Sequence, residues 1–294
     1  MLWIIFTAAA APLQIARNAL QRGLVGDAGP WGATLVRFLF GLPFSLATFA
    51  VVAFATAGAE PHLSVRFAIA VAFGAIAQVA ATAALLMAMR HSGFAVATFM
   101  QQSSLPLAAI MGFTLFGDHM SPVQWTGLAA TTLGLLVLSW PKPGTVEAGM
   151  LSGSFYGLAS GLAFAVALNG YRQAGMALEP HHPIYSATAA LCVAQTLQSI
   201  VLGAILAVTR PQALRAVAMS WKPSLGAGFF GTAASVFWFS ALAMAPAGQV
   251  RAVGVIEGPL AAAVGRRLFK ERMTVLQILG GLATAVGVVT TALG

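Results

Sequence analysis

Apolar segments long enough to cross a membrane follow one another along almost the whole chain. A helix of about 20 apolar residues spans the roughly 30 Å hydrocarbon core of a bilayer. Charged residues make up only 7% of the 294 residues, whereas soluble domains carry about a quarter. The regular apolar–polar alternation typical of transmembrane strands is absent. The sequence therefore predicts an all-α integral membrane protein.

Short polar stretches that contain Pro or Gly separate the apolar segments. They divide the chain into ten predicted transmembrane helices, and the longest loop is expected near 209–222. The predicted spans are 2–19, 31–56, 66–89, 94–116, 122–140, 150–176, 184–208, 223–245, 250–268 and 273–292.

Two stretches of the chain repeat each other. Residues 106–134 and 259–287 agree at 13 of 29 aligned positions, at an offset of 153 residues. Each copy covers the last two spans of a group of five, so the predicted units are 1–141 and 149–294. Because five is odd, tandem units must cross the membrane in opposite orientations, as in many secondary transporters. The sequence thus predicts two inverted five-helix repeats around a central cavity; a duplication that merely enlarged the bundle is the alternative.

The repeated pattern resembles that of a known transporter family. It is carried by Pro106, Gly112, Asp118, Gln124, Gly127 and Gly134, and by Pro259, Gly265, Glu271, Gln277, Gly280 and Gly287. This pattern is similar to that of the EamA-like members of the drug/metabolite transporter superfamily. The resemblance implies secondary active transport of small polar or amphipathic metabolites, amino acids among them, with export the favoured direction. An importer or exchanger of the same fold remains an alternative.

Two other classes of protein compete with a transporter: an integral-membrane enzyme and a structural membrane subunit. The chain has no HExxH, GxSxG or phosphate-loop motif. The adjacent His181 and His182 suggest a metal, but neighbouring side chains point in different directions. We therefore expect no catalytic residue, no metal and no cofactor.

Polar side chains within the spans are the candidate substrate-binding residues, because such groups usually face the bundle interior or a wet cavity. The alternative for each is a hydrogen bond between helices, worth about 0.6 kcal/mol on average. The candidates are Gln14, Asn18, Arg37, Gln78, Gln101, Asn169, Gln195, Trp238 and Glu257.

Three of these candidates carry specific hypotheses. Arg37 suits an anionic group on the substrate, or else it reaches a membrane surface or pairs with a loop. Trp238 lies at mid-span, where it could stack on a substrate or pack against helices or lipid. Glu257 could carry a coupling proton, or form a structural ion pair with Arg172 or Arg251.

Residues of the repeated pattern also have structural roles to fill. Gly127 and Gly134 are seven residues apart, on one helix face that another helix can approach closely. Asp118 precedes a helix, where an acid suits the helix dipole. Pro106 is expected to kink its helix and free the Gln102 carbonyl.

The partners expected from the sequence are a small-molecule substrate, the lipid bilayer and, as a candidate coupling ion, protons. The net charge is +8, but the basic residues flank spans, which favours topology setting and contact with anionic lipid over nucleic acid. We expect a monomer or homodimer in the bacterial inner membrane. The charge distribution places both termini outside the cytoplasm, whereas the resemblance places them inside.

Overall fold

The computed structural model describes residues 1–138, 150–258, 260, 263–264, 267 and 275–293. It is 89% helical, and no strand occurs among the described residues. The helices are α1 (Leu2–Leu39), α2 (Leu42–Ala55), α3 (Val65–Ser92), α4 (Phe94–Gln101), α5 (Ser104–Phe116), α6 (Pro122–Leu138), α7 (Met150–Leu178), α8 (Pro183–Thr209), α9 (Pro211–Met219), α10 (Trp221–Met244), α11 (Ala247–Gly254) and α13 (Val275–Leu293).

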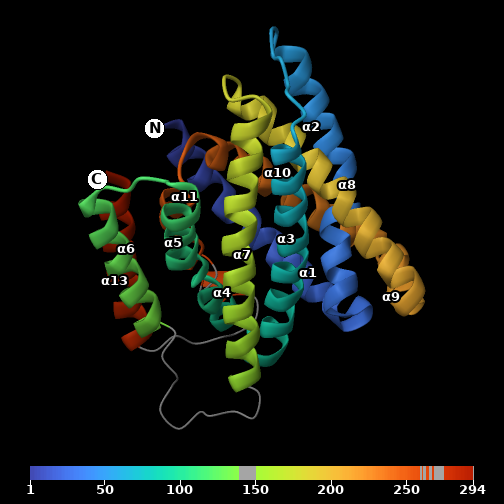
Figure 1. The fold of residues 1–294 in the computed structure, drawn as a ribbon. Coiled ribbons are helices and arrows are strands. Elements are labelled where there is room, and N and C mark those ends of the chain that lie inside the picture. The colour runs from blue at the N-terminus through green and yellow to red at the C-terminus, as the bar shows by residue number, and fades with distance from the viewer. Residues whose placement is uncertain (139–149, 259, 261–262, 265–266, 268–274, 294) are drawn as a thin grey trace.

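The outside of the helix bundle is apolar. Large apolar side chains stand exposed on it, such as Phe54 (94% exposed), Leu151 (85%) and Val208 (84%). Within the described part of the chain, five stretches are long and apolar enough to cross a membrane: α1 with α2, α3, α7, α8 and α10. The chain is therefore an all-α, multi-pass membrane protein. Its two ends lie at the same end of the bundle (Figure 1).

Helix α1 continues through the region where the sequence predicts a break between the first two spans. Only Gly29 leaves the helical conformation, with φ 68° and ψ 172°, a backbone region that favours glycine. Pro30 follows at the start of the next helical stretch, where its missing N–H costs no hydrogen bond. Across this kink, Gln21 Nε2 donates to the Ala33 carbonyl at 2.7 Å. The predicted limits 2–19 are wrong, because one glycine turns the chain and the polar residues before it stay helical.

The second predicted span, 31–56, is interrupted between α1 and α2. At the interruption, Thr232 Oγ1 donates to the Gly41 carbonyl at 3.0 Å. Gln195 Nε2 donates to the same hydroxyl oxygen at 3.2 Å. A Cβ on Gly41 would lie 2.6 Å from Thr232 Oγ1, so the contact requires glycine. Side chains of α8 and α10 thus hold the break in place.

The fourth predicted span, 94–116, is two helices, α4 and α5, separated by a turn at residues 102–103. Pro106 lies in the first turn of α5, where a proline removes no intrahelical hydrogen bond. The Gln102 carbonyl accepts the Leu105 N–H at 2.9 Å and is not free. The kink predicted at Pro106 is therefore a helix break with its own turn.

Part of the second repeat copy lies outside the described residues. This applies to Pro259, Gly265 and Glu271, and to the predicted boundary between the two units at 141–149. Of the ninth predicted span, 250–268, the structure describes α11 and scattered residues beyond it.

The predicted loop near 209–222 is instead occupied by the short helix α9. Pro211 starts it, a favoured position for proline. Val217 is buried and packs towards Gly32 of α1, where an added Cβ would lie 3.4 Å from the Val217 Cγ2. The prediction of a loop was wrong because this polar, basic stretch carries one apolar face that α1 covers.

Helices α6 and α13 pack closely through the glycines of the repeated motif. A Cβ on Gly134 would lie 2.5 Å from the Thr284 backbone nitrogen and 2.8 Å from the Gly280 carbonyl oxygen. At the other end of the contact, Gly127 faces Thr291. The two helices therefore run antiparallel, side by side at one edge of the bundle (Figure 1). The close approach predicted from the glycine spacing is confirmed.

Two further helix pairs surround the centre of the bundle. Helix α1 packs along α10, and α3 packs along α7. Helix α11 contacts α1 and α5, which brings its residues toward the same interior. These elements position the candidate site.

Candidate functional site

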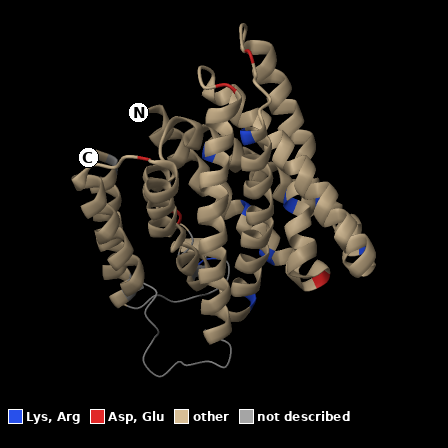
Figure 2. Ribbon diagram, viewed as in Figure 1, with Lys and Arg blue, Asp and Glu red and all other residues tan. Residues whose placement is uncertain are grey.

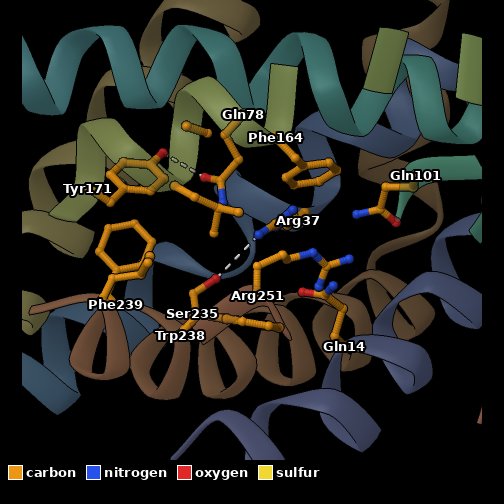
Figure 3. A pocket seen from close by; sticks show the side chains of 13 residues that line it. Gln14, Arg37, Gln78, Gln101, Phe164, Tyr171, Ser235, Trp238, Phe239 and Arg251 are labelled. Atoms are coloured by element: carbon orange, nitrogen blue, oxygen red, sulfur yellow. Dashed lines mark hydrogen bonds between the residues drawn. The ribbon is translucent and has the colours of Figure 1, made fainter. Parts of the chain in front are cut away.

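A central cavity lies among α1, α3, α4, α7, α10 and α11 (Figure 3). Its polar lining comes from residues of both halves of the chain, which face one another across it. The remaining walls are aromatic and aliphatic, with Phe164 and Tyr171 from α7 and Trp238 and Phe239 from α10. The polar lining consists of Gln14, Arg37, Gln78, Gln101, Ser235 and Arg251.

The carboxylate of Glu257 lies beside this cavity and is fully buried. Gln14 Nε2 donates to Glu257 Oε1 at 2.6 Å. Arg251 Nη1 donates to Glu257 Oε2 at 3.3 Å, which makes a buried ion pair. This pairing leaves the Glu257 carboxylate with partners on both oxygens.

Arg172, the other predicted partner of Glu257, pairs elsewhere. Its Nη2 lies 2.8 Å from Asp118 Oδ1, and its Nε lies 3.0 Å from both carboxylate oxygens. Of the two partners predicted for Glu257, Arg251 forms the ion pair and Arg172 does not, because Arg172 lies near the end of α7 that meets the loop after α5. Asp118 thereby connects the loop after α5 to α7.

Arg251 connects several helices. Its Nε donates to Ser104 Oγ at 2.7 Å, and its Nη2 donates to Gln102 Oε1. The guanidinium also lies over the Trp238 ring, with Cζ 5.5 Å from the centroid, a cation–π arrangement. Trp238 is thus a packed interior residue that lines the cavity, and it does not face lipid.

Arg37 enters the cavity from α1 (Figure 3). Its Nη1 donates to Thr82 Oγ1 at 3.0 Å and its Nη2 to Ser235 Oγ at 3.3 Å. Among the described residues no carboxylate lies within ion-pair distance, and Arg37 Nε has no hydrogen-bond partner. The side chain is 2% exposed, so it neither reaches a membrane surface nor pairs with a loop.

One wall of the cavity is a polar network between α3, α7 and α8. Tyr171 donates its O–H to Gln78 Oε1 at 2.8 Å. Gln198 Nε2 donates to the same Gln78 oxygen at 2.8 Å. The Tyr171 ring packs on Phe239, with centroids 4.0 Å apart. The Tyr171 hydroxyl and the Gln198 amide therefore orient Gln78, and Phe239 in turn holds the Tyr171 ring.

The structure brings five of the nine predicted residues together at the cavity: Gln14, Arg37, Gln78, Gln101 and Trp238. Glu257 lies directly behind Gln14 and Arg251, without lining the cavity itself.

The remaining three predicted residues do not line this cavity: Asn18 bonds within α1, whereas Asn169 and Gln195 bond to other helices. Asn18 Oδ1 accepts from Arg17 Nε at 3.1 Å. Asn169 Nδ2 donates to the carbonyls of Ala108 and Ala165 at 3.1 and 3.0 Å. Gln195 donates to Thr232 at the break before α2.

Sequence reasoning did not select Tyr171, Ser235 or the aromatic residues of α7 and α10. It considered Arg251 only as a partner of Glu257. The signal for Tyr171 was a polar ring within a span, two residues after Asn169. Nothing in the sequence distinguishes Ser235 from other small polar residues.

Positive charge predominates inside the bundle. Apart from the loop residue Glu179, the buried charged side chains of the described residues are Arg17, Arg37, Arg251 and Glu257. Figure 2 shows acidic residues mainly at the ends of helices, and several basic positions along them. Ionised groups inside a membrane protein are costly and usually functional.

The two adjacent histidines belong to a loop structure. His182 Nδ1 lies 3.6 Å from Glu179 Oε1. The Glu179 carboxylate also accepts the N–H of Glu60 at 2.8 Å and that of His181 at 3.1 Å. The Glu60 N–H, followed by that of His181, holds the pKa of Glu179 below its ordinary value. In the described part of the chain, no three His, Cys, Asp or Glu side chains gather as metal ligands.

The comparisons with known proteins agree with this architecture. Residues 151–293 match the model of the EamA-like transporter family. These residues belong to the EamA-like transporter family. The family lies in the drug/metabolite transporter superfamily, which confirms the resemblance found in the repeated motif. The EamA-like family is one of transporters, and the match therefore suggests a membrane transporter of the drug/metabolite transporter type.

The EamA-like match falls within the predicted second unit, 149–294. Over the whole chain the fold is similar to that of a crystal structure described only as that of a protein. The two share 16% sequence identity with a TM-score of 0.60, and the alignment covers 97% of each chain. At that identity the likeness shows the fold alone. No curated protein matches the sequence.

Proposed function

We propose that this protein is a secondary active transporter that moves small polar or amphipathic metabolites across the bacterial inner membrane by alternating access, with export the favoured direction. Amino acids are among the candidate substrates. The observation that carries the proposal is the central cavity, because it places arginine and glutamine side chains from both halves of the chain at the centre of an apolar bundle. Substrate sites of many secondary transporters lie at the interface between repeats.

The packing of the helices supports two inverted five-helix repeats as the framework. At the offset of 153 residues, α6 corresponds to α13, and these two helices run antiparallel. The same offset relates the two large contacts: α1 on α10 corresponds to α7 on α3. A pseudo-two-fold axis in the membrane plane relates elements in this way. Gly29 would then separate the first two of ten spans.

Broken helices support alternating access. The chain is interrupted between α1 and α2, between α4 and α5, and after α11. The second interruption supplies Gln102, and α11 supplies Arg251, and these two side chains bond to each other. A transporter needs elements that move as units around a fixed site, and helix breaks provide hinges.

Flux measurement tests the proposal. The purified protein is reconstituted in liposomes, and uptake of labelled metabolites is measured under imposed substrate and pH gradients. Arg251→Gln, which removes a charge from the cavity, should abolish gradient-driven flux, whereas Arg90→Gln at the exposed end of α3 should not. If the liposomes show only substrate-independent leak, or no flux of any metabolite, the transporter proposal fails and the protein is better explained as a structural membrane subunit. Flux that runs only inward would favour the importer.

Cysteine accessibility tests the inverted repeats. In a Cys192→Ala background, single cysteines at His119 and Arg272 mark the equivalent turns of the two repeats. A membrane-impermeant thiol reagent should label them from opposite faces of the membrane. Labelling from the same face would rule out inversion.

A further inference from the structure

The buried charges around the cavity do not balance. Arg251 shares the Glu257 carboxylate, whose second oxygen is bonded to Gln14. Arg17 and Arg37 have no carboxylate within ion-pair distance among the described residues. Two positive charges thus remain uncompensated in a low-dielectric interior, where each is costly. Such a site favours an anion that neutralises one of them.

The two arginines lie next to each other. A Cβ on Gly231 of α10 would lie 3.2 Å from Arg17 Cδ and 3.3 Å from Arg37 Cγ. Arg17 contacts Asn18 and does not line the cavity, whereas Arg37 does. An anion in the cavity would therefore contact Arg37 directly, and the neighbouring Arg17 would attract it electrostatically without contact.

Two side chains that line the cavity each have a hydrogen-bond donor without a partner in the described part of the chain. Arg37 Nε and Trp238 Nε1 both lack a partner among the described residues. Both side chains line the cavity, at 2% and 6% exposure. The other Arg37 contacts go to the hydroxyls of Thr82 and Ser235, which orient the guanidinium without neutralising it. A guanidinium fork matches a carboxylate in shape and charge.

The rest of the lining suits an uncharged, apolar body. Phe164, Tyr171, Phe239 and Leu242 are among the remaining lining residues. No carboxylate among the described lining residues is available for a substrate ammonium group, because the nearby Glu257 is already paired. Arg37 is therefore the charged lining residue that can pair with a substrate, and its charge is positive.

Given the proposed transport function, we propose that the substrate is a small organic carboxylate with an apolar body, whose carboxylate binds Arg37 and the Trp238 N–H. The apolar body lies against the aromatic wall formed by α7 and α10. Zwitterionic amino acids and neutral molecules of the same size bind more weakly.

Three probes with the same ring test the inference: phenylacetate, phenylalanine and phenylacetamide, which are an anion, a zwitterion and a neutral amide. Their binding to the purified full-length protein is measured by calorimetry and by thermal stabilisation, which follows from mass action. Phenylacetate should bind at least about tenfold more tightly than the other two, the order expected for one charge-assisted hydrogen bond. Equal or tighter binding of phenylalanine or the amide overturns the proposal.

Arg37→Gln should weaken phenylacetate binding by about tenfold to a hundredfold, and the exposed Arg90→Gln should leave it unchanged. The ligand-free melting temperature of Arg37→Gln should be equal to or above that of the native protein, because a costly charge is removed. If that variant does not fold, Trp238→Phe, which keeps a ring and loses the N–H, should still lower affinity for phenylacetate and not for phenylacetamide. Unchanged phenylacetate affinity in the folded variant overturns the proposal.

The binding and flux measurements test the carboxylate site and the transport function separately. If liposomes show Arg37-independent flux of neutral or zwitterionic metabolites and none of carboxylates, the anion proposal fails while the transporter stands. If phenylacetate binds through Arg37 but no flux of any metabolite is found, the binding site stands and transport fails.

Discussion

Arg251 lies over the face of Trp238, with the guanidinium carbon 5.5 Å from the ring centroid, and so joins α11 to α10 at the edge of the cavity. The contact depends on Gly254, whose position directly abuts the far edge of the Trp238 ring. Charge, aromatic ring and glycine thus form one packed unit next to Glu257.

This unit makes Gly254→Ala a sensitive test. The added Cβ would overlap the Trp238 ring, and overpacking of this kind typically costs about 1–3 kcal/mol. We expect a lower melting temperature and weaker ligand binding. Adding Trp238→Phe, which removes the clashing atoms, should restore much of the stability. A Gly254→Ala protein with native stability would show that the ring can move freely.

Glu257→Gln tests the buried ion pair and the proton hypothesis together. The change leaves the buried Arg251 charge without its carboxylate, and breaking such pairs typically costs about 3–5 kcal/mol. We expect reduced thermal stability, partly recovered in the Arg251→Gln/Glu257→Gln double variant.

If Glu257 also carries the coupling proton, the flux that remains in Glu257→Gln should no longer respond to a pH gradient. Flux is measured in the same liposomes at equal and unequal pH. A pH response identical to that of the native protein would exclude Glu257 as the proton carrier.

The glycines of α6 provide a test with a matched control. A Cβ at Gly134 would lie 2.5 Å from the Thr284 backbone nitrogen, so Gly134→Ala should separate α6 from α13 and lower stability by about 1–3 kcal/mol. At Gly203 in α8 nothing lies within 4 Å. Gly203→Ala should therefore raise stability by up to about 1 kcal/mol, the gain in helix propensity. Thermal unfolding in detergent measures both.

Asp118→Asn should weaken the connection between the loop after α5 and α7. The pair with Arg172 is mostly shielded from solvent, at 9% and 12% side-chain exposure, and hydrogen bonds to charged groups contribute about 1.5–3 kcal/mol. We expect a loss within that range in thermal unfolding. Exchange of the two charges, Asp118→Arg with Arg172→Asp, should recover part of it, and no recovery would point to other contacts of Asp118.

The stability contributed by Glu179 should depend on pH. Its pKa in the folded protein is lowered, chiefly by the Glu60 N–H, so its stabilising effect is present above the pKa of the unfolded chain, near 4.5. The effect is lost as pH falls from there through the folded pKa. Glu179→Gln should thus lower the melting temperature at pH 7, and the difference from the native protein should shrink below about pH 4.5. A difference that stays constant with pH would mean that charge is not involved.

Much of the fold can be predicted from the sequence, because hydropathy and glycine spacing are local properties. The apolar segments indicate the membrane-spanning helices, and the spacing of Gly127 and Gly134 indicates the helix face that approaches α13. Five cavity residues are found because polar side chains within a span usually turn inward. This rule identifies the interior but does not say which polar groups meet there.

Which polar groups meet depends on the tertiary structure. Gln14 and Glu257 are 243 residues apart in the chain and 2.6 Å apart in space, and Arg172 faces Asp118 instead of Glu257 because of how α7 is placed along α5. The break at Gly41 depends on Thr232 in α10, a partner that no local pattern reveals. Hydrophobicity and side-chain size are properties of single residues, so the sequence alone identifies the apolar segments and the helix faces lined by small residues. Electrostatic pairing depends on distances between residues far apart in the chain, so only the packed helices establish which charges are paired and which remain open to a ligand.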